Sequence, residues 1–304
     1  MTADASPGPW QALALNHDIA AKLREMADLL AAQQADGYRI AAYRRAASAI
    51  DALTVSVDAI AREKGLAGLV ELPAIGQGIG GAIMEMIATG RWTALERLNG
   101  QIEPERLFRT LPGVGPDLAH RIHDALHIDT LEGLELALHD GRFEGIAGFG
   151  ERRIAALRAE VAERLGHRRI RAPASPASPS VAILLDVDRE YREKAASGEL
   201  RKIAPRRFNP SGAAWLPVLH AQRSGWSLTL LYSNTQRAHD LGRTQDWVVA
   251  YYHEAGGPES QCTIVTETRG PLAGRRVVRG REGDCIAHYA AIDSGRGGDD
   301  VTPT

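Results

Sequence analysis

The sequence predicts a multidomain protein with an all-α helix-hairpin-helix N-terminal half and a small α+β C-terminal domain, mainly an antiparallel sheet. Three observations lead to this prediction. A glycine-bearing segment occurs three times between residues 72 and 157, and each copy precedes an amphipathic helical pattern. Residues 167–180 are rich in Pro, Ala and Ser, which is typical of a linker. Beyond them, short runs of β-branched and aromatic residues are separated by turn residues.

The composition is that of an ordinary globular protein. Hydrophobic residues make up 44% of the 304 residues and charged residues 24%, and no apolar run is long enough to span a membrane. The first residues lack the basic and apolar regions of a secretory signal. Cys262 and Cys285 have neither zinc-ligand spacing nor the density of a disulfide scaffold. We therefore expect a cytoplasmic protein of bacterial type, associated with the nucleoid and without membrane contact.

Helical periodicity starts at Asn16, which can cap the first helix. A turn at Asp36-Gly37 ends that helix, and a second helix is expected over residues 38–53. A third, shorter helix is expected over 56–63. From there to about residue 166 the chain consists of short helical patterns broken by Gly and Pro, with no alternating strand pattern.

The C-terminal part has a different pattern. A helix is expected over residues 181–197, and five strand-like runs follow it: WLPVLHA, WSLTLLYS, DWVVAYYH, QCTIVTET and RRVVRG. The divisions that we expect along the chain are a flexible leader at 1–15, a helical domain with the first hairpin at 16–92, a second helical domain at 93–166, the linker at 167–180, the α+β domain at 181–290 and a disordered tail at 291–304.

The three repeated segments are LPAIGQGIGGAI (72–83), LPGVGPDLAHRI (111–122) and IAGFGERRIAAL (146–157). Each forms a tight turn around one apolar residue, directly before a helix. Glycine in such a turn permits a positive φ and lets a phosphate approach the backbone, where the helix dipole and the first N–H groups favour an anion. Because these contacts carry no base information, we predict sequence-independent binding to the DNA backbone.

The first two copies differ in their glycines. The second, Gly113-Val114-Gly115, is the most complete. In the first, Ala74 replaces the leading glycine, which makes that turn less permissive, although Gly78, Gly80 and Gly81 keep the start of the helix open.

The third copy, Gly148-Phe149-Gly150, has both glycines but is followed by Glu151, whose charge would repel a phosphate. Arg152 and Arg153 can compensate for that charge. For this copy, phosphate binding at Gly148 and Gly150 and a purely structural turn remain equally open.

These segments, together with AAYRRAASAI (41–50), resemble the N-terminal part of family X DNA polymerases over about residues 16–166. The resemblance implies an eight-kilodalton-type domain followed by a thumb-like domain. It also implies that the first hairpin grips the downstream strand of a gap and the second grips the primer strand. The positions implied to bind phosphate are Gly76 and Gly78 for the first hairpin, Gly113, Gly115 and Asp117 for the second, and Tyr43 and Arg44 near the 5′ phosphate of the gap.

The same resemblance implies that hairpin carbonyls hold a monovalent cation such as K⁺ or Na⁺. The matching carbonyls belong to Leu72, Ile75, Leu111 and Val114. No other cofactor is expected.

Two departures from the family concern its chemistry. The polymerase needs a Gly-Ser turn and three carboxylates around two Mg²⁺ ions. Beyond residue 170, the only Asp-x-Asp is Asp186-Val187-Asp188, in a helical pattern without such a turn, so we interpret it as helix surface rather than a metal site. The lyase lysine of animal members corresponds to Ala82, and the nearby Lys64 is expected at a solvated helix end. An enzyme is therefore the less favoured interpretation.

The C-terminal domain shows no motif of a characterised family. Arg275, Arg279 and Arg281 share a face of one expected strand, which is either a phosphate-binding stripe or a charged edge strand. The sequence Arg206-Arg207-Phe208 could stack on an unpaired base, although a surface loop is the favoured interpretation. A hydrolytic or metal site is the less favoured alternative to a capped loop for one polar group, which consists of His239, Asp240, Arg243 and Asp246 with His220 or His253.

The favoured function is non-catalytic binding to gapped, nicked or end-bearing DNA, in DNA repair and without polymerase activity. One alternative is a repair enzyme, a nuclease or a lyase, with catalysis in the C-terminal domain. Another is a scaffold in which the hairpins only pack and the sheet domain binds a protein. The net charge of −2 argues against a protein that coats long DNA. The sequence indicates no protein partner, oligomeric state or preferred DNA structure.

Overall fold

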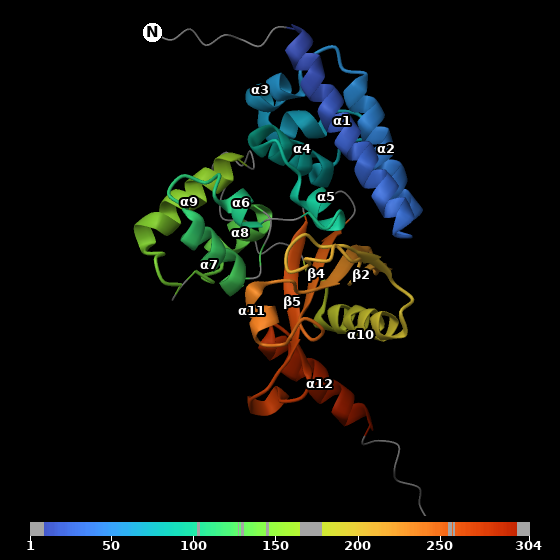
Figure 1. Ribbon diagram of the computed structural model, residues 1–304, viewed down its shortest axis with the longest axis vertical. Coiled ribbons are helices and arrows are strands. Elements are labelled where there is room, and N and C mark those ends of the chain that lie inside the picture. Colours follow the sequence, from blue (N-terminus) through green and yellow to red (C-terminus); the bar gives the residue numbers. More distant parts are fainter. Residues whose placement is uncertain are drawn as a thin grey trace, which may run out of the picture.

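The computed structural model describes residues 9–101, 104–126, 128, 131–143, 146–164, 178–254, 257 and 259–296. It confirms the predicted fold class, because a helical N-terminal half precedes a C-terminal domain with one antiparallel sheet (Figure 1). Residues 1–8 of the expected leader, most of the expected linker and residues 297–304 of the expected tail lie outside the described residues.

Five helices form the first helical unit: α1 (Pro9–Ala32), α2 (Gly37–Asp51), α3 (Val57–Val70), α4 (Gln77–Thr89) and α5 (Thr93–Leu98). The long helices α1 and α2 lie side by side (Figure 1). Asp36 caps α2 by accepting hydrogen bonds from the amides of Tyr38 and Arg39. The apolar stripe of α1, which includes Leu23 and Met26, is fully buried in the core of this unit.

The start of α1 corrects one prediction. The helix begins at Pro9, so Asn16 lies within it and is only 2% exposed. The Asn16 side chain donates to the Val55 carbonyl and accepts from the Val57 amide, both at 2.9 Å. Since Ser56 makes no side-chain cap, Asn16 caps α3 from a neighbouring helix. A cap residue can thus serve a helix distant in sequence, which a local pattern does not reveal.

The third helix is also longer than expected, because two helical stretches join across a kink at Gly65, where φ is +63°. Glycine accepts this left-handed conformation without steric cost.

A second helical unit contains the other two hairpins. It consists of α6 (Pro104–Phe108), α7 (Pro116–Leu126), α8 (Leu131–His139) and α9 (Glu151–Arg164). The second hairpin joins α6 to α7, and the third joins α8 to α9. Phe143 and Phe149 meet edge-to-face at 5.0 Å in a core that belongs to this unit. We call residues 104–164 the tandem module.

The C-terminal sheet has six strands in sequence order, each antiparallel to the next. They are β1 (Arg201–Ile203), β2 (Leu216–Arg223), β3 (Trp226–Tyr232), β4 (Val248–Glu254), β5 (Ser260–Thr266) and β6 (Arg276–Val278). The five expected runs correspond to β2 to β6, whereas β1 was not predicted because it is short and mostly polar.

Helices cover one face of this sheet. They are α10 (Val181–Ser197), which has the expected bounds, and α12 (Glu282–Arg296), which was not predicted. Residues 291–296 therefore continue a helix, in contrast to the disordered tail expected from residue 291. The short helices α11 (Gln236–Asp240) and η1 (Gly270–Leu272) lie in the connections β3–β4 and β5–β6.

The opposite face of the sheet packs against the first helical unit. Because side chains alternate along a strand, Val218, Leu231 and Val249 point to this face. They share one apolar core with Trp92 and Leu98 of the helical unit. The sheet is therefore the middle layer of the molecule, and its packing fixes the first helical unit in place.

Candidate nucleic-acid interface

The three hairpins have the same backbone hydrogen bonds. In each, the amide of the central apolar residue donates to the carbonyl three residues earlier, at 3.1–3.2 Å; the pairs are Ile75 with Leu72, Val114 with Leu111, and Phe149 with Ile146. The first bond of each following helix is also equivalent, at 2.8–3.1 Å; the pairs are Gly80 with Gly76, Ala119 with Gly115, and Ile154 with Gly150. The sequence repeat is therefore a structural repeat.

The turn residue has a left-handed backbone in all three copies. Its φ is +61° at Ala74, +79° at Gly113 and +94° at Gly148. For alanine this conformation costs about 1–2 kcal/mol. The first turn therefore keeps the hairpin geometry in spite of the less permissive residue, and the burial of Ile75, which is 4% exposed, opposes that cost.

The outer surface of each hairpin is open to solvent. Ala74, Gly113, Gly115, Gly148 and Gly150 are exposed or half-buried at the turns, while Val114 and Phe149 point into the core. A Cβ atom added at Gly113, Gly115 or Gly150 would meet no protein atom within 4 Å. A phosphate can therefore approach these backbone positions without displacing any part of the protein.

The helix starts supply N–H groups at the same places. The amides of Gln77, Gly78 and Ile79 come before the first intrahelical bond of α4, so no carbonyl of the helix accepts from them. In α7, Pro116 has no N–H, which leaves Asp117 as the first amide donor of that helix. The residues predicted to contact phosphate thus lie in the turns and at the helix starts; they are Gly76, Gly78, Gly113, Gly115 and Asp117.

The third hairpin lies against the helix of the second. Arg121 of α7 donates to the Ala147 carbonyl at 2.9 Å, and a Cβ atom at Gly148 would approach Leu118 of α7 at 2.8 Å. The two hairpins are therefore neighbours on one module. Arg153 donates to the Gly148 carbonyl.

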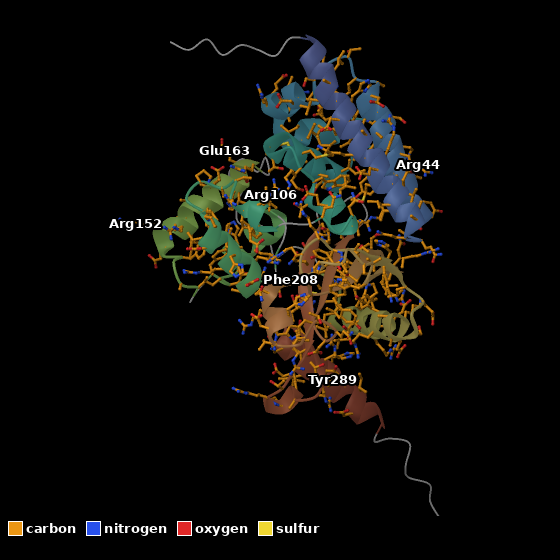
Figure 2. The ribbon with its side chains drawn as sticks, viewed as in Figure 1. Arg44, Arg106, Arg152, Glu163, Phe208 and Tyr289 are labelled. Carbon is orange, nitrogen blue, oxygen red and sulfur yellow. The ribbon has the colours of Figure 1, made fainter. Side chains whose placement is uncertain are left out.

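Arginines surround this third hairpin. Arg121 and Arg153 bind its carbonyls, and Arg152 is exposed at the outer edge of α9 (Figure 2). Glu151 is the single acidic residue in this stretch from residue 146 to residue 157. The positive charge of the side chains therefore exceeds the negative charge at the third hairpin.

Tyr43 and Arg44 have different surroundings. The Tyr43 ring packs on Trp92, with 5.5 Å between ring centroids, and burial raises the pKa of its hydroxyl, against the opposing effect of Arg39. Tyr43 thus contributes to the packing between the first helical unit and the sheet domain. Arg44 is exposed on the outer side of α2 and lies 3.2 Å from Asp28 (Figure 2).

The positions relevant to lyase chemistry are unsuited to a nucleophilic amine. Ala82 is 8% exposed on α4 and carries no amine. Lys64 lies on the surface, with its Nζ 3.1 Å from Glu71 Oε2. The hydrogen bond and charge of Glu71 raise the Lys64 pKa, whereas a Schiff-base lysine needs a lowered one.

We interpreted both aspartates of the Asp-x-Asp in α10 as helix surface. This interpretation is wrong for Asp188, which is buried. Asp188 is fully buried and accepts two hydrogen bonds from Arg276, at 2.7 and 2.9 Å, and one from Arg192 at 3.1 Å. Asp186 is half-exposed and pairs with Arg189 and Arg223. The two arginines neutralise the buried Asp188 carboxylate, and its ion pair with Arg276 links α10 to β6.

The three arginines that were expected to share a face of one strand lie outside strand β6; they are Arg275, Arg279 and Arg281. Strand β6 covers only 276–278, and Arg276 is the buried partner of Asp188. The three expected stripe residues each pair with a carboxylate; the pairs are Arg275 with Asp293, Arg279 with Glu267, and Arg281 with Asp284. Because β6 is an edge strand, the structure agrees with the interpretation of a charged sheet edge.

The polar group around α11 is a capped loop. The Thr235 hydroxyl caps the helix by accepting from the Ala238 amide, His239 bonds Asn234 at 2.6 Å, and Asp246 accepts from Thr266 and Arg276. Among the described residues, no three His, Cys, Asp or Glu side chains gather closely enough to hold a metal ion. Cys262 and Cys285 are both free.

A polar joint between the helical and sheet parts was not predicted. Arg97 of α5 pairs with Glu259 at 3.0 Å and lies 3.4 Å above the Tyr251 ring. Burial raises the Glu259 pKa, but the nearby arginines, Arg97 first, lower it further, so the net shift is downward. These residues are 162 positions apart, so no local sequence signal could have revealed the pair.

A chain of hydrogen bonds extends this joint. Arg39 donates to Thr229 Oγ1 at 3.3 Å, and Thr229 lies 3.0 Å from His220 Nδ1. His220 Nε2 lies 2.8 Å from Gln33 Oε1, and Gln33 Nε2 donates to the Leu98 carbonyl. Since Gln33 Oε1 can only accept, His220 carries its proton on Nε2 and accepts from the Thr229 hydroxyl on Nδ1. We call this group of residues the joint; it consists of Gln33, Arg39, Arg97, His220, Thr229, Tyr251 and Glu259.

Comparison with known proteins agrees with this geometry. Residues 14–92 match a family described as "Helix-hairpin-helix domain", and residues 105–163 match a "SAM-like Helix-hairpin-helix tandem". The chain is similar to "DNA polymerase/3'-5' exonuclease PolX" of Bacillus subtilis (strain 168), with 27% identity over 137 residues. That alignment spans 44% of this chain and only 23% of the length of the relative.

These matches confirm the resemblance of the N-terminal half to the helix-hairpin-helix region of family X polymerases. Helix-hairpin-helix domains indicate DNA binding, generally without sequence preference. In the part of the chain that the structure describes, no helix is both long and apolar enough to traverse a bilayer.

Proposed function

We propose that this protein, whose N-terminal half is a family X polymerase-like helix-hairpin-helix region, binds the phosphate backbone of gapped, nicked or end-bearing DNA. The observation that carries this proposal is the shared hairpin geometry: three exposed turns, each with a left-handed residue and free amides at a helix start. This arrangement suits an anion that approaches the backbone closely. Backbone contacts of this kind explain recognition without a globally basic protein.

The positions of the hairpins favour DNA with a strand interruption. The second and third hairpins belong to the tandem module, whereas the first belongs to a unit held on the sheet. Phosphates would bind at Gly76 and Gly78 in the first unit, and at Gly113, Gly115 and Asp117 in the second. Two phosphate-binding sites on different structural units can accommodate DNA that bends at a nick or a gap. An interrupted strand allows the duplex to bend at that point.

A role in DNA repair without polymerase activity follows from the same proposal. The similarity to PolX covers the helix-hairpin-helix region, and Asp188, the candidate metal ligand beyond it, is occupied by Arg276. A protein of this kind would act in the cytoplasm at the nucleoid.

The carbonyls of the first two hairpins fit a monovalent cation in their chemistry. Neutral oxygen ligands suit K⁺ or Na⁺. Each carbonyl oxygen has two lone pairs. The Leu72 carbonyl uses one of them to accept from the Ile75 amide, and the Leu111 carbonyl uses one to accept from the Val114 amide, so one remains for a cation. We include these four carbonyls in the proposal as cation ligands. A cation there would add positive charge next to the bound phosphate.

The affinity for DNA should fall as salt increases. Neutralising two to five phosphates releases counterions, which gives a slope of about −2 to −4.5 in a plot of log association constant against log salt. Fluorescence anisotropy with a one-nucleotide-gapped duplex between about 50 and 200 mM KCl measures this slope. An affinity independent of salt would contradict phosphate binding and favour the scaffold.

Gly115→Val should weaken binding to every DNA sequence alike, by about 1–3 kcal/mol, which is five- to 150-fold. A Cβ atom at Gly115 meets no protein atom within 4 Å, so we expect the hairpin to keep its fold while the methyl groups of valine block the phosphate. Titration of two gapped duplexes that differ in sequence measures the loss. Gly150→Val makes the same test at the third hairpin and decides between phosphate binding and a structural turn there.

The matched control is Gly283→Val, because Gly283 in α12 also has open space around its Cβ position and lies outside the hairpins. It should leave DNA affinity unchanged. A loss for Gly115→Val that varies with DNA sequence, or an equal loss for Gly283→Val, would refute backbone recognition by the second hairpin.

A further inference from the structure

A small cavity lies where the tandem module, α5 and the sheet meet. It encloses about 60 Å³, several times the space that one water molecule needs. The lining includes His123 from α7, Tyr251 from β4, and Arg206, Arg207 and Asn234 from the loops at the end of the sheet. The cavity therefore combines an apolar floor with arginines and an amide.

The next residue along one of these loops is an aromatic side chain held at the surface. Phe208 is 37% exposed and has a φ of +54°, which is rare for a bulky residue. Asn234 donates to the carbonyl of Arg207 at 3.2 Å, and Asn209 donates to the Ala213 carbonyl at 2.9 Å. These bonds fix the loop in a strained conformation that presents an aromatic ring. Strain of this kind is often retained at functional sites.

The ring contacts two neighbouring side chains, His239 and the guanidinium of Arg207, and remains partly exposed. Phe208 and His239 lie 4.4 Å apart between centroids, with an angle of 43° between their planes. Burial, with a further contribution from Arg207, lowers the pKa of His239, so the imidazole is neutral at neutral pH. The exposed part of the Phe208 ring remains available to a planar group.

The surroundings carry net positive charge. The Arg207 guanidinium lies 4.9 Å from the Phe208 ring centre and 3.0 Å from Glu105 of α6. Arg206, two residues before Phe208 in the loop, and Arg237, two residues before His239 in α11, are both exposed. The Asp240 carboxylate accepts from the Gln236 amide and keeps its negative charge, so the carboxylates of Glu105 and Asp240 stand against three arginines, Arg206, Arg207 and Arg237. The charge is therefore complementary to an anion.

The loop that carries Phe208 adjoins the tandem module, because Arg206 and Arg207 line the same cavity as His123 of α7 and Arg207 pairs with Glu105 of α6. Figure 2 shows Phe208 where the tandem module meets the sheet domain. His123, which lines the cavity, is on the same helix as the hairpin amides. From Pro116 to His123 the helix rises about 10 Å, equal to about three nucleotides of a stacked strand.

We propose that Phe208, with Arg206 and Arg237, binds one unpaired nucleotide of the DNA held by the tandem module. The base stacks on Phe208, and its phosphate meets the two arginines. A paired base cannot stack in this way because its neighbours in the duplex cover its faces. The inference rests on the proposed function and deepens it, since it names an overhanging or displaced nucleotide as the feature that the protein selects.

The test compares a blunt duplex with the same duplex bearing one unpaired 2-aminopurine nucleotide at its 3′ or 5′ end. The wild-type full-length protein should bind at least one of the overhang duplexes about fivefold or more tightly than the blunt one, and should quench the 2-aminopurine. Phe208→Ala should lose both the preference and the quenching, while its affinity for the blunt duplex stays unchanged. Arg206→Ala should reduce the preference.

Tyr38→Ala is the matched control, because Tyr38 is an exposed aromatic residue on α2, at 86% exposure. It should keep the overhang preference. The inference is overturned if wild-type protein shows no preference, if Phe208→Ala retains it, or if Phe208→Ala weakens blunt and overhang duplexes equally. If the protein quenches free 2-aminopurine deoxynucleotide as strongly as the overhang, the inference that the nucleotide must belong to the bound DNA is overturned. Failure of the proposed function is distinguishable, because the wild-type protein would then bind no duplex at all.

Discussion

Arg97→Ala is expected to lower the free energy of unfolding by about 3–5 kcal/mol. The Arg97 side chain is 5% exposed and forms an ion pair with Glu259 at the joint. Its removal leaves the Glu259 carboxylate without its main counter-charge in a largely buried position. The loss also includes the contact between the guanidinium and the Tyr251 ring. Urea denaturation followed by circular dichroism measures the change.

Two further variants separate the ion pair from general damage. Arg44→Ala removes an exposed partner of Asp28 and should cost less than about 1 kcal/mol. The double variant Arg97→Ala with Glu259→Ala should be less destabilised than the sum of the two single variants, because neither charge is then left unpaired. Additive effects, or equal losses for Arg97→Ala and Arg44→Ala, would show that the ion pair does not hold the two parts together.

Acid is expected to weaken the protein through His220. Burial, with a contribution from Arg39, lowers the His220 pKa from 6.5 to about 3. Below pH 6.5 the unfolded chain therefore binds a proton that the folded chain does not bind, so stability falls as the pH falls. No stability is lost through His220 above pH 6.5, and the loss grows as the pH falls until it reaches about 4–5 kcal/mol near pH 3.

The hydrogen bonds give the reason for this direction. The His220 ring already donates to Gln33 and accepts from Thr229, and Arg39 brings a positive charge to the same hydroxyl. A second ring proton would remove the acceptor at Nδ1 and place another charge next to Arg39. His253, whose pKa is also lowered by burial and by Arg39, contributes in the same direction.

The measurement is the free energy of unfolding at pH 7 and pH 4.5 for wild type and His220→Gln. The variant should lose less stability between these values than wild type, by about 2–3 kcal/mol, since glutamine does not titrate. His139→Gln is the control, because His139 is exposed at the end of α8 and far from the joint in sequence, and its loss of stability between pH 7 and pH 4.5 should exceed that of His220→Gln. An unchanged pH dependence in His220→Gln would contradict the assignment.

The sequence by itself determined those features that depend on local patterns. The three hairpins, the bounds of α10 and the strands β2 to β6 follow from glycine positions and from helical or alternating periodicity. These signals are local because backbone conformation is limited by the residue itself and its nearest neighbours. The similarity of the N-terminal half to family X polymerases was visible for the same reason, since its motifs are contiguous segments.

Only the tertiary structure decided the use of isolated polar residues. Asn16 caps a helix 41 positions away, Asp188 is neutralised by Arg276 at a separation of 88, and Arg97 meets Glu259 at 162. Tyr43, which the resemblance implies lies near a phosphate, packs on Trp92. The physical reason is that a polar side chain can be satisfied by any partner that folding brings near, and the free energy of burying it depends on whether such a partner offsets its desolvation.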